Sequence, residues 1–448
     1  MGLLIALAAA GAQVPLGRPK IQPLRQDEDW RPFCSRHPST PGWDRLKCLG
    51  IGSDGATLTL GGELRLRGEA NSAPGFSLNA PRDGALMYRV LLHADLRTDG
   101  PLRLFVQLGH AESYGRPFRK PTTDRDDLDV VQGFAELAWP VAGGTFALRA
   151  GRQEIALGSQ RLVSVRAATN IRRSLDGLHL QFSRRRIWLE AFVLHPVRVA
   201  PRAFDDVTDR SERLSGAQLT LPLGGPLRAD ILALDFRRDH ARFALATGRE
   251  RRTSLGLRLF GRAGNWDWDV EAVRQTGSLD RRRIDAWTLA SEIGLRTGGF
   301  NSVRFSLKAN VASGARGQSD TLETFNAIYP RLPYFSEANL ISPANVIDLL
   351  PSVLVHPTSR IDLGFGWDRF WRHRQTDGVY GPNLVPLPGS DHMEGRDIGQ
   401  QAIIDYSLRA GAGITVSGQL VAFSPANGLR HVGATGGTYF SMQLSKQF

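Results

Sequence analysis

The chain has 448 residues, of which 42% are hydrophobic and 22% charged, and its formal net charge is +12. It contains no run approaching the roughly 18 apolar residues that a membrane-spanning helix needs, which excludes a helical membrane protein. Five of the 56 basic residues are Lys and the rest are Arg, whose guanidinium group holds carboxylates and phosphates through paired hydrogen bonds. This suits an anionic partner, although a GC-rich genome would also favour Arg. We expect no nucleic acid partner, because there is no helix-turn-helix, zinc-finger or RNP motif and Asp and Glu are spread among the Arg residues.

The N-terminus, "MGLLIALAAAGAQ", has the apolar core of a secretory signal and a small-x-small site at Ala10-Gly11-Ala12. We predict a signal peptide over residues 1–12; it is short and lacks a basic n-region, which leaves open a truncated signal or a plain apolar terminus. Residues 13–56 are predicted to form an N-terminal periplasmic segment. Its Cys34 and Cys48 would form a disulfide in an oxidising compartment, with two free thiols as the alternative.

From Leu58 to the C-terminus, apolar and polar residues alternate with the period of a β-strand. In "LTLGGELRLRGE" (58–69) the Leu residues share one face, while Glu63, Arg65 and Arg67 lie on the other. The polar faces carry full charges, and the strands are too many to be surface hairpins.

Short and long connectors separate these strands in turn. The short connectors are 97–101, 140–144, 183–186, 222–226, 261–265, 297–301, 356–359 and 410–413. The long polar loops lie near 70–84, 111–129, 155–173, 196–212, 237–252, 276–285, 314–344, 372–400 and 425–436. Eight short turns alternating with nine long loops define eighteen strands.

We therefore predict an all-β fold: an 18-stranded antiparallel transmembrane β-barrel over residues 57–448, with short periplasmic turns and long extracellular loops. Its apolar faces would contact the lipid of the bacterial outer membrane, and its charged faces would line a lumen wide enough for an aqueous channel. The terminal Phe448 resembles the C-terminal aromatic signal that the barrel-assembly machinery reads. A large soluble β protein also alternates, but the exported start, the two classes of connector and the final Phe favour the barrel.

Cations on the polar strand faces are the candidates for contact with a solute. They are Arg65, Arg67, Arg89, Arg304, Lys308 and Arg409. Asp267, Asp269 and Glu271 lie on a different strand, so opposite charges on different walls would set up a field across the lumen.

The stretch 151–182 adds a second group of charged residues. It contains Arg152, Arg161, Arg166, Arg172, Arg173 and Asp176. If this loop folds inward, its guanidinium groups gather at a constriction and pass a carboxylate from one to the next. The alternative is a structural ion network in which Arg172, Arg173 and Asp176 hold the loop.

The loop 314–344 carries Tyr329, Arg331, Tyr334 and Phe335, which suit a lid, an inward constriction or an aromatic cluster at the membrane interface. The ten His residues show no metal-ligand spacing and there is no G-x-S-x-G motif. We therefore predict no enzyme, no cofactor and no metal site. The stretch "TTDRDDLD" (122–129) lacks the Gly and Glu of an EF-hand loop, but its aspartates leave calcium binding open.

Three stretches resemble the alginate export family of outer-membrane barrels. They are "EDWRPFCSRHPSTPGWDRLKCLGIGSDGATLTLGGELRLRGE" (28–69), "GRQEIALGSQRLVSVRAATNIRRSLDGLHLQF" (151–182) and the segment from "TFNAIYPRLPYF" to "GVYGP" (324–382). The resemblance implies an eighteen-stranded channel that passively exports an anionic polysaccharide, an alginate-like polyuronate, through an Arg-lined lumen, with periplasmic export components as further partners.

One feature departs from the family pattern. The alginate exporter is described with a long periplasmic turn that plugs the pore, whereas every periplasmic turn predicted here is short. The alternatives are a porin for small anionic solutes and a barrel enzyme with an extracellular site.

Overall fold

The computed structural model describes residues 19–34, 42–52, 55–78, 80, 82–116, 122–298, 302–317, 319–411 and 413–448. The predicted signal peptide, residues 1–12, lies outside these described residues. No helix in the described chain is long and apolar enough to cross a membrane.

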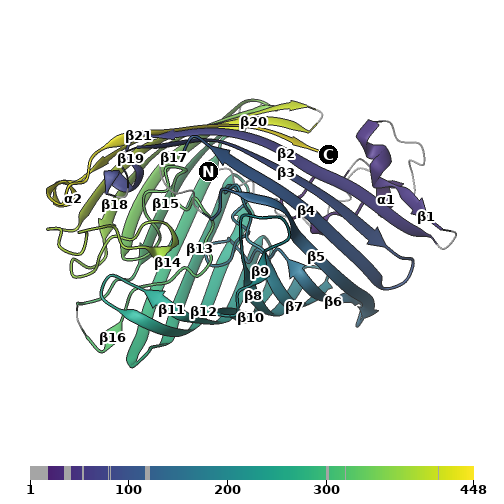
Figure 1. Ribbon diagram of the computed structural model, residues 1–448, viewed down its shortest axis with the longest axis horizontal. Coiled ribbons are helices and arrows are strands. Elements are labelled where there is room, and N and C mark those ends of the chain that lie inside the picture. The colour runs from purple at the N-terminus through teal and green to yellow at the C-terminus, as the bar shows by residue number, and fades with distance from the viewer. Residues whose placement is uncertain are drawn as a thin grey trace.

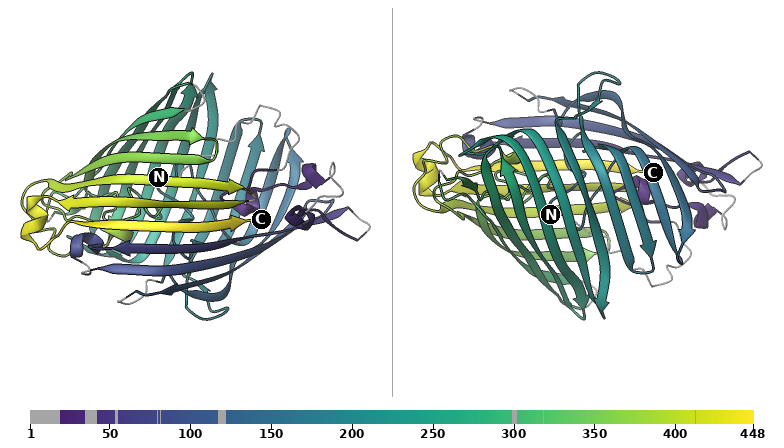
Figure 2. Two further views of the ribbon diagram at one scale, coloured as in Figure 1. Left: turned by 90° about the horizontal axis from the view of Figure 1, so that it is seen from above. Right: turned by 90° about the horizontal axis from the view of Figure 1, so that it is seen from below.

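Across the described residues, eighteen long antiparallel strands form one closed barrel, as predicted. In chain order they are β2 (Ala56–Asn71), β3 (Asp83–Arg97), β4 (Leu102–Tyr114), β5 (Asp126–Val141), β6 (Gly144–Gln153), β7 (Leu175–Arg184), β8 (Ile187–Arg198), β10 (Glu212–Gly224), β11 (Leu227–Arg242), β12 (Thr247–Ala263), β13 (Trp266–Leu279), β14 (Arg282–Arg296), β15 (Val303–Ala312), β17 (Val346–Thr358), β18 (Ile361–Arg372), β19 (Asp397–Gly411), β20 (Ile414–Pro425) and β21 (Gly437–Gln447). Pairing of β21 with β2 closes the barrel, with Leu444 opposite Leu66. The yellow C-terminal strands accordingly lie beside the purple N-terminal strands in Figure 2.

The alternating sequence puts apolar side chains on the outside of the barrel. Leu64 and Leu66 of β2 are 46% and 47% exposed, whereas Glu63 and Arg65 are 8% and 4% exposed. Because successive side chains of a strand point to opposite faces, the register of the strand fixes which face each of its residues occupies. The outer surface is therefore the apolar band of a membrane barrel.

Short turns gather at one end of the barrel and longer connections at the other. In Figure 1 the N-terminal helix α1 (Arg31–Cys34) lies near the C-terminus at the short-turn end, and α2 (Asn427–His431) lies at the opposite end. By the habit of outer-membrane barrels, the short-turn end is periplasmic and the other extracellular.

The predicted lengths of two loops, 237–252 and 276–285, are wrong. Only residues 243–246 separate β11 from β12, and only 280–281 separate β13 from β14. The charged residues that made these stretches look like loops lie on strand ends. There Arg252 and Glu250 form an ion pair inside the barrel, with Nε 2.6 Å from Oε1.

The residues before β2 fold back against the periplasmic end of the barrel. They form η1 (Arg25–Asp27), α1, η2 (Gly42–Lys47) and β1 (Leu49–Ile51), which pairs with the start of β2. A disulfide joins Cys34 to Cys48, so the bridged alternative is the one present. At the other terminus, Phe448 exchanges backbone hydrogen bonds with Gly62 (2.9 and 3.1 Å).

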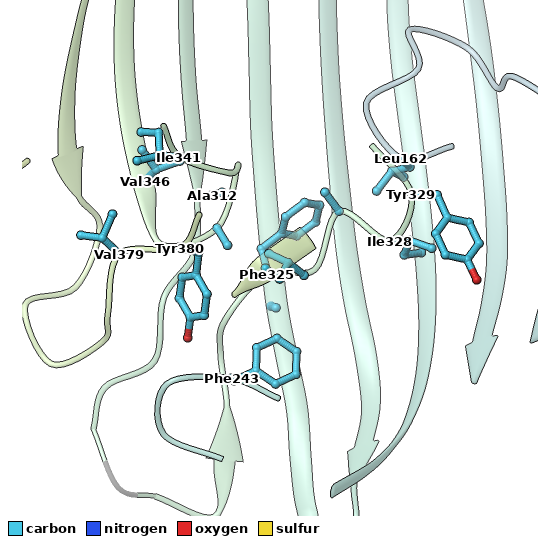
Figure 3. Close-up of a cluster of buried hydrophobic side chains, with 14 of the residues drawn as sticks. Leu162, Phe243, Ala312, Phe325, Ile328, Tyr329, Ile341, Val346, Val379 and Tyr380 are labelled. Atoms are coloured by element: carbon cyan, nitrogen blue, oxygen red, sulfur yellow. The ribbon is translucent and has the colours of Figure 1, made fainter. Parts of the chain in front are cut away.

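Loops fill the extracellular half of the lumen. The longest connections, 154–174, 313–345 and 373–396, contribute buried apolar side chains to one core with the strand walls. Figure 3 shows Phe325 and Tyr329 of the second loop inside the barrel near Leu162 of the first. The shorter elements of this end are η3 (Pro74–Ser77), β9 (Val207–Thr208), β16 (Thr321–Leu322) and η4 (Pro382–Leu384). Packed side chains therefore fill the extracellular half of the lumen and leave few voids, as in a protein interior.

Candidate functional site: the constriction and the periplasmic cavity

The predicted constriction is the connection between β6 and β7, residues 154–174, which we call the inward loop. Two predicted lumen cations hold its backbone: Arg65 donates to the Thr169 carbonyl at 2.8 Å, and Arg89 donates to the same carbonyl at 2.9 Å. The side-chain amide of Asn170 donates to the carbonyl of Asp124 at 2.8 Å. Arg65 and Arg89 therefore point into the barrel, as the alternation predicts, but they bind the loop and are buried.

One ion pair closes the inward loop on itself, and Arg161 ties the loop to the barrel wall. Arg172 holds Glu154 with both Nε and Nη2, at 2.6 and 2.7 Å. Arg161 reaches β13, where its Nη1 lies 3.0 Å from Asp269 and 2.8 Å from Glu271. The acidic residues of β13 thus bind the loop itself.

Asp176 does not join Arg172 and Arg173 in one network, although the three were predicted together. It accepts hydrogen bonds from Arg152 Nε at 2.9 Å and from the Thr208 hydroxyl at 2.7 Å. Asp176 therefore ties the start of β7 to β6 and β9.

The second long loop, 313–345, packs directly on the inward loop. Val163 and Tyr329 form a parallel backbone bridge, and the Arg173 guanidinium lies over the Tyr329 ring at 4.2 Å. Arg166 donates to the side chain of Asn383 at 2.9 Å in the third loop. Of the three alternatives for the loop 314–344, a lid, an inward constriction and an interfacial aromatic cluster, the structure shows the loop folded inward.

The prediction that opposite charges lie on different walls of the lumen is wrong for the charged residues of β13 and β15. Arg304 of β15 holds Asp267 of β13 (Nε–Oδ2 3.1 Å), and it also lies 2.8 Å from Glu292 of the strand between them. Lys308 lies 3.6 Å from Glu292. The two signs therefore occupy neighbouring strands and neutralise each other locally, because strand pairing brings them into contact.

The remaining predicted cations are also paired. Arg67 lies 3.2 Å from Glu337 of the second loop. Arg409, at the periplasmic end, donates to Asp362 at 3.1 Å.

The N-terminal residues 19–30, which we call the strap, enter the periplasmic mouth of the barrel. Arg25 donates to the carbonyl of Phe448 at 2.9 Å, and Arg103 of β4 donates to the carbonyl of Gln26 at 2.6 Å. The strap therefore lies along the lumen wall of the first strands.

The strap and the inward loop contact each other inside the lumen. Arg172 Nη2 donates to the Pro23 carbonyl at 2.9 Å, and the Gln26 amide donates to the Glu154 carbonyl at 2.9 Å. Two segments from opposite ends of the barrel thus meet at one point and narrow the path between them.

A cavity of about 300 Å³ lies between the strap, the inward loop and the wall from β6 to β12. Three cations reach it: Arg149, Arg228 and Arg258. Arg149 is held by Glu136 at 2.6 Å, and Arg258 by Asp230 at 2.9 Å.

Arg228 differs from the other two cations. Its guanidinium lies over the Phe260 ring at 5.3 Å, and within the described chain no carboxylate lies at ion-pair distance from it. Trp188 gives the same cavity a second aromatic side chain. The cavity therefore offers a cation and aromatic faces together, which suits a carboxylated sugar.

None of the three cavity arginines was among the predicted site residues. Their position in the alternation marks them as lumen-facing, so the pattern that singled out Arg65 could have found Arg228. The strap could not have been found in this way, because residues 19–30 carry no periodic signal.

Comparison with solved structures gives outer-membrane porins of the same fold. OpdO of Pseudomonas aeruginosa superposes with a TM-score of 0.60 at 13% identity, over 87% of this chain and 97% of its own. OccAB1 of Acinetobacter baumannii gives a TM-score of 0.59 at 10% identity, over 91% and 99%. OccK2 (OpdF) of P. aeruginosa, solved in complex with glucuronate, gives 0.58 at 12% identity, over 87% and 98%. At such identities the likeness establishes the fold.

A search of curated proteins found no match. The sequence pattern of the alginate export family matches residues 56–438, which is nearly the whole barrel. With the porin fold of its structural neighbours, this makes the protein an outer-membrane channel. The chain belongs to the alginate export family.

Proposed function

We propose that this outer-membrane channel carries an anionic polysaccharide, an alginate-like polyuronate, out of the cell by passive diffusion. The observation that carries the proposal is Arg228, a cation at the periplasmic cavity without a carboxylate partner in the described chain. A guanidinium binds a carboxylate through paired hydrogen bonds, and the nearby Trp188 and Phe260 offer faces for sugar rings. Membership of the alginate export family supports the same class of solute.

The proposed transport step is an exchange of partners. A uronate carboxylate binds Arg228 first and then competes with Asp230 for Arg258 and with Glu136 for Arg149. Arg258 and Arg149 exchange one carboxylate for another, while the displaced Asp230 and Glu136 keep their hydrogen bonds from Thr220 and Arg103, so this exchange leaves no bare buried charge. Weak and repeated sites of this kind let a polymer enter without trapping it.

Passage also needs the strap and the inward loop to separate. The contact between Arg172 and Pro23 joins the two segments across the lumen. Once it opens, the arginines of the loop would line the path: Arg161, Arg166, Arg172 and Arg173. We assign the predicted constriction residues this second role in the open state.

A porin for small anionic solutes is the second candidate. It is favoured by the cavity of about 300 Å³, at the lower limit of pockets that hold one small molecule. The neighbour OccK2 (OpdF), solved with glucuronate, has the same fold. A single sugar acid would use Arg228 in the same way as one residue of a polymer.

Two partner assignments belong to the proposal. Phe448 would be read by the barrel-assembly machinery before the barrel closes, because in the closed barrel its ring lies against Trp43, with ring centroids 4.8 Å apart. Residues 13–56 would meet periplasmic export components, since the strap has to move for transport.

Single-channel current in a planar bilayer tests the function. A salt gradient gives the ion selectivity, and oligouronates are then added on the periplasmic side and compared with neutral oligosaccharides of equal length. Anion-selective current that long oligouronates block, with neutral sugars inert, supports export of a polyuronate. Block by monomeric glucuronate alone supports the small-solute porin, and cation-selective current contradicts both.

A further inference from the structure

Three aspartates from two separate segments converge at the extracellular rim of the barrel. Asp126 and Asp129 lie at the start of β5, and Asp206 lies just before β9. One carboxylate oxygen of each residue lies within 4.8 Å of those of the other two. The sequence stretch 122–129 showed only two of these residues, because the third is about eighty positions away.

Asp126 is the member whose polar atoms are least satisfied. Its side chain is 4% exposed, and its buried Oδ1 has no hydrogen-bond partner within the described chain. A buried carboxylate oxygen without a hydrogen-bond partner loses its hydration and gains no compensating hydrogen bond, so such atoms are rare in folded proteins. The carboxylate is oriented toward other acids, which points to a cationic ligand.

The other two carboxylates are held in place by backbone amides. Asp129 accepts from the Asp206 N–H at 3.1 Å, and Asp206 accepts from the Ala200 N–H at 2.7 Å. A carboxylate has about four acceptor positions, so these bonds leave lone pairs free. The amides therefore fix the direction of the carboxylates without using up their capacity to bind.

The local charge is negative. Asp127 and Asp205 flank the three aspartates in the sequence. Arg152 is the nearby cation, 3.7 Å from Asp129, but its shorter hydrogen bonds go to Asp176. Each of these observations describes a group of acids that lacks a sufficient counter-charge.

We propose that Asp126, Asp129 and Asp206 bind a calcium ion at the extracellular rim. Calcium takes oxygen ligands at 2.3–2.6 Å, so two ligands on opposite sides of one ion lie up to about 5 Å apart, which the spacing of this group meets. Magnesium, at 2.0–2.1 Å, spans at most about 4.2 Å, so calcium accepts the whole range of separations up to 4.8 Å and magnesium only the lower part of it. The absence of His and Cys from the group disfavours zinc.

The ion would fasten the connection between β8 and β10 to the neighbouring part of the rim. In the described chain a backbone hydrogen bond from Phe204 to Leu128 (3.1 Å) already joins the same two segments. The calcium bridge would strengthen this junction, because it replaces the mutual repulsion of the carboxylates by shared coordination. The exposed tip of the connection, with Arg202 and Phe204, would then be less able to detach.

The test uses the full chain, purified in detergent and stripped with EDTA. Calorimetric titration with calcium chloride should show one saturable site, and magnesium chloride should bind at least about tenfold more weakly. Asp126→Asn and Asp206→Asn should each lower calcium affinity by about tenfold or more, as expected for loss of a charged ligand. Asp239→Asn, which alters an exposed aspartate on β11, is the matched control and should bind as the wild type does.

A local measurement separates coordination from a general effect on folding. Trypsin cleavage after Arg202 should slow on addition of calcium in the wild type and not in Asp206→Asn, while heat-modifiable migration on gels confirms that both barrels are folded. No saturable calcium binding, or equal binding by the wild type and both folded variants, would overturn the proposal.

Discussion

Arg172 donates to the carbonyl of Pro23 at 2.9 Å while it holds the carboxylate of Glu154 at 2.6 Å. One side chain therefore joins a segment that enters from the periplasm to a loop that enters from outside. Because the two segments belong to opposite ends of the barrel, this contact joins them across the lumen.

Replacing Arg172 by Ala should loosen both segments. Glu154 would be left buried without its partner, a change that typically costs about 3–5 kcal/mol. We expect more frequent open events in single-channel recordings at unchanged anion selectivity. Arg31→Ala, which removes an exposed pair with Asp29, is the control. Equal open probability in both variants would show that the contact does not gate the path.

The open probability should also depend on pH through Asp27 of the strap. This residue is exposed toward the cavity, and the barrel wall around it limits the hydration of its carboxylate. Burial is the main cause that raises its pKa to about 6; Glu190 and Glu136 add to the shift, and Arg149 and Arg103 oppose it. A free Asp has a pKa near 3.9, so the docked strap binds the proton more tightly than the released strap does.

The sign follows from this difference. Stabilisation of the docked strap is complete below about pH 4 and is lost as the pH rises through about 6. We expect the channel to open more often at pH 7 than at pH 4, and Asp27→Asn to flatten this dependence. Asp99→Asn, in a periplasmic turn, should leave it unchanged. A channel that opens more at low pH would contradict the assignment.

The disulfide should hold the strap near the barrel mouth. A cross-link across 14 positions typically contributes about 3 kcal/mol by restricting the unfolded segment. In Cys34→Ser/Cys48→Ser, trypsin should cleave after Arg45 faster than in the wild type, with the barrel still migrating as folded. Reduction of the wild type should reproduce the effect, and unchanged cleavage in both cases would show that the bridge is not needed for docking.

Arg228→Ala should weaken block by oligouronates by about tenfold or more, because a hydrogen bond to a charged group is worth about 1.5–3 kcal/mol. Arg237→Ala is a suitable control, since Arg237 is exposed at the extracellular end of β11 and pairs with Asp235. If the two variants are blocked equally, the cavity is not on the path of the solute.

Gly177 should not tolerate a side chain. It lies directly opposite Gly151 where the inward loop leaves the sheet, and their φ angles are 150° and 130°. A Cβ at Gly177 would overlap the Val193 carbonyl. Gly177→Ala should therefore lower the yield of folded, heat-modifiable barrel, whereas Gly68→Ala, with open space around it, should not.

Sequence reasoning recovered the barrel because its signals are local. Alternation over a few residues assigns Glu63 and Leu64 to opposite faces, and the same rule applied along the chain gives eighteen strands. The rule fails where charge marks the end of a strand rather than a loop, as at Glu250 and Arg252. The faces were therefore predicted better than the loop lengths.

The partners of the lumen cations could not be predicted in the same way. Arg65 binds carbonyls about one hundred positions away, and Arg172 binds Glu154 of its own loop and Pro23 of the distant strap. No periodicity encodes such contacts, because they depend on how loops pack inside the barrel. The sequence shows that a guanidinium faces inward, and only the packing shows whether it binds a neighbouring carboxylate or, as at Arg228, has none within the described chain.

The hydrogen bond from Arg25 to Phe448 has a consequence for biogenesis. Its acceptor sits at the seam where the last strand meets the first, and that acceptor is in place only after the two have paired. This contact of the strap can therefore form only when the cylinder is complete. An unfinished barrel would lack it, so the strap would be held in the lumen less firmly than in the closed barrel.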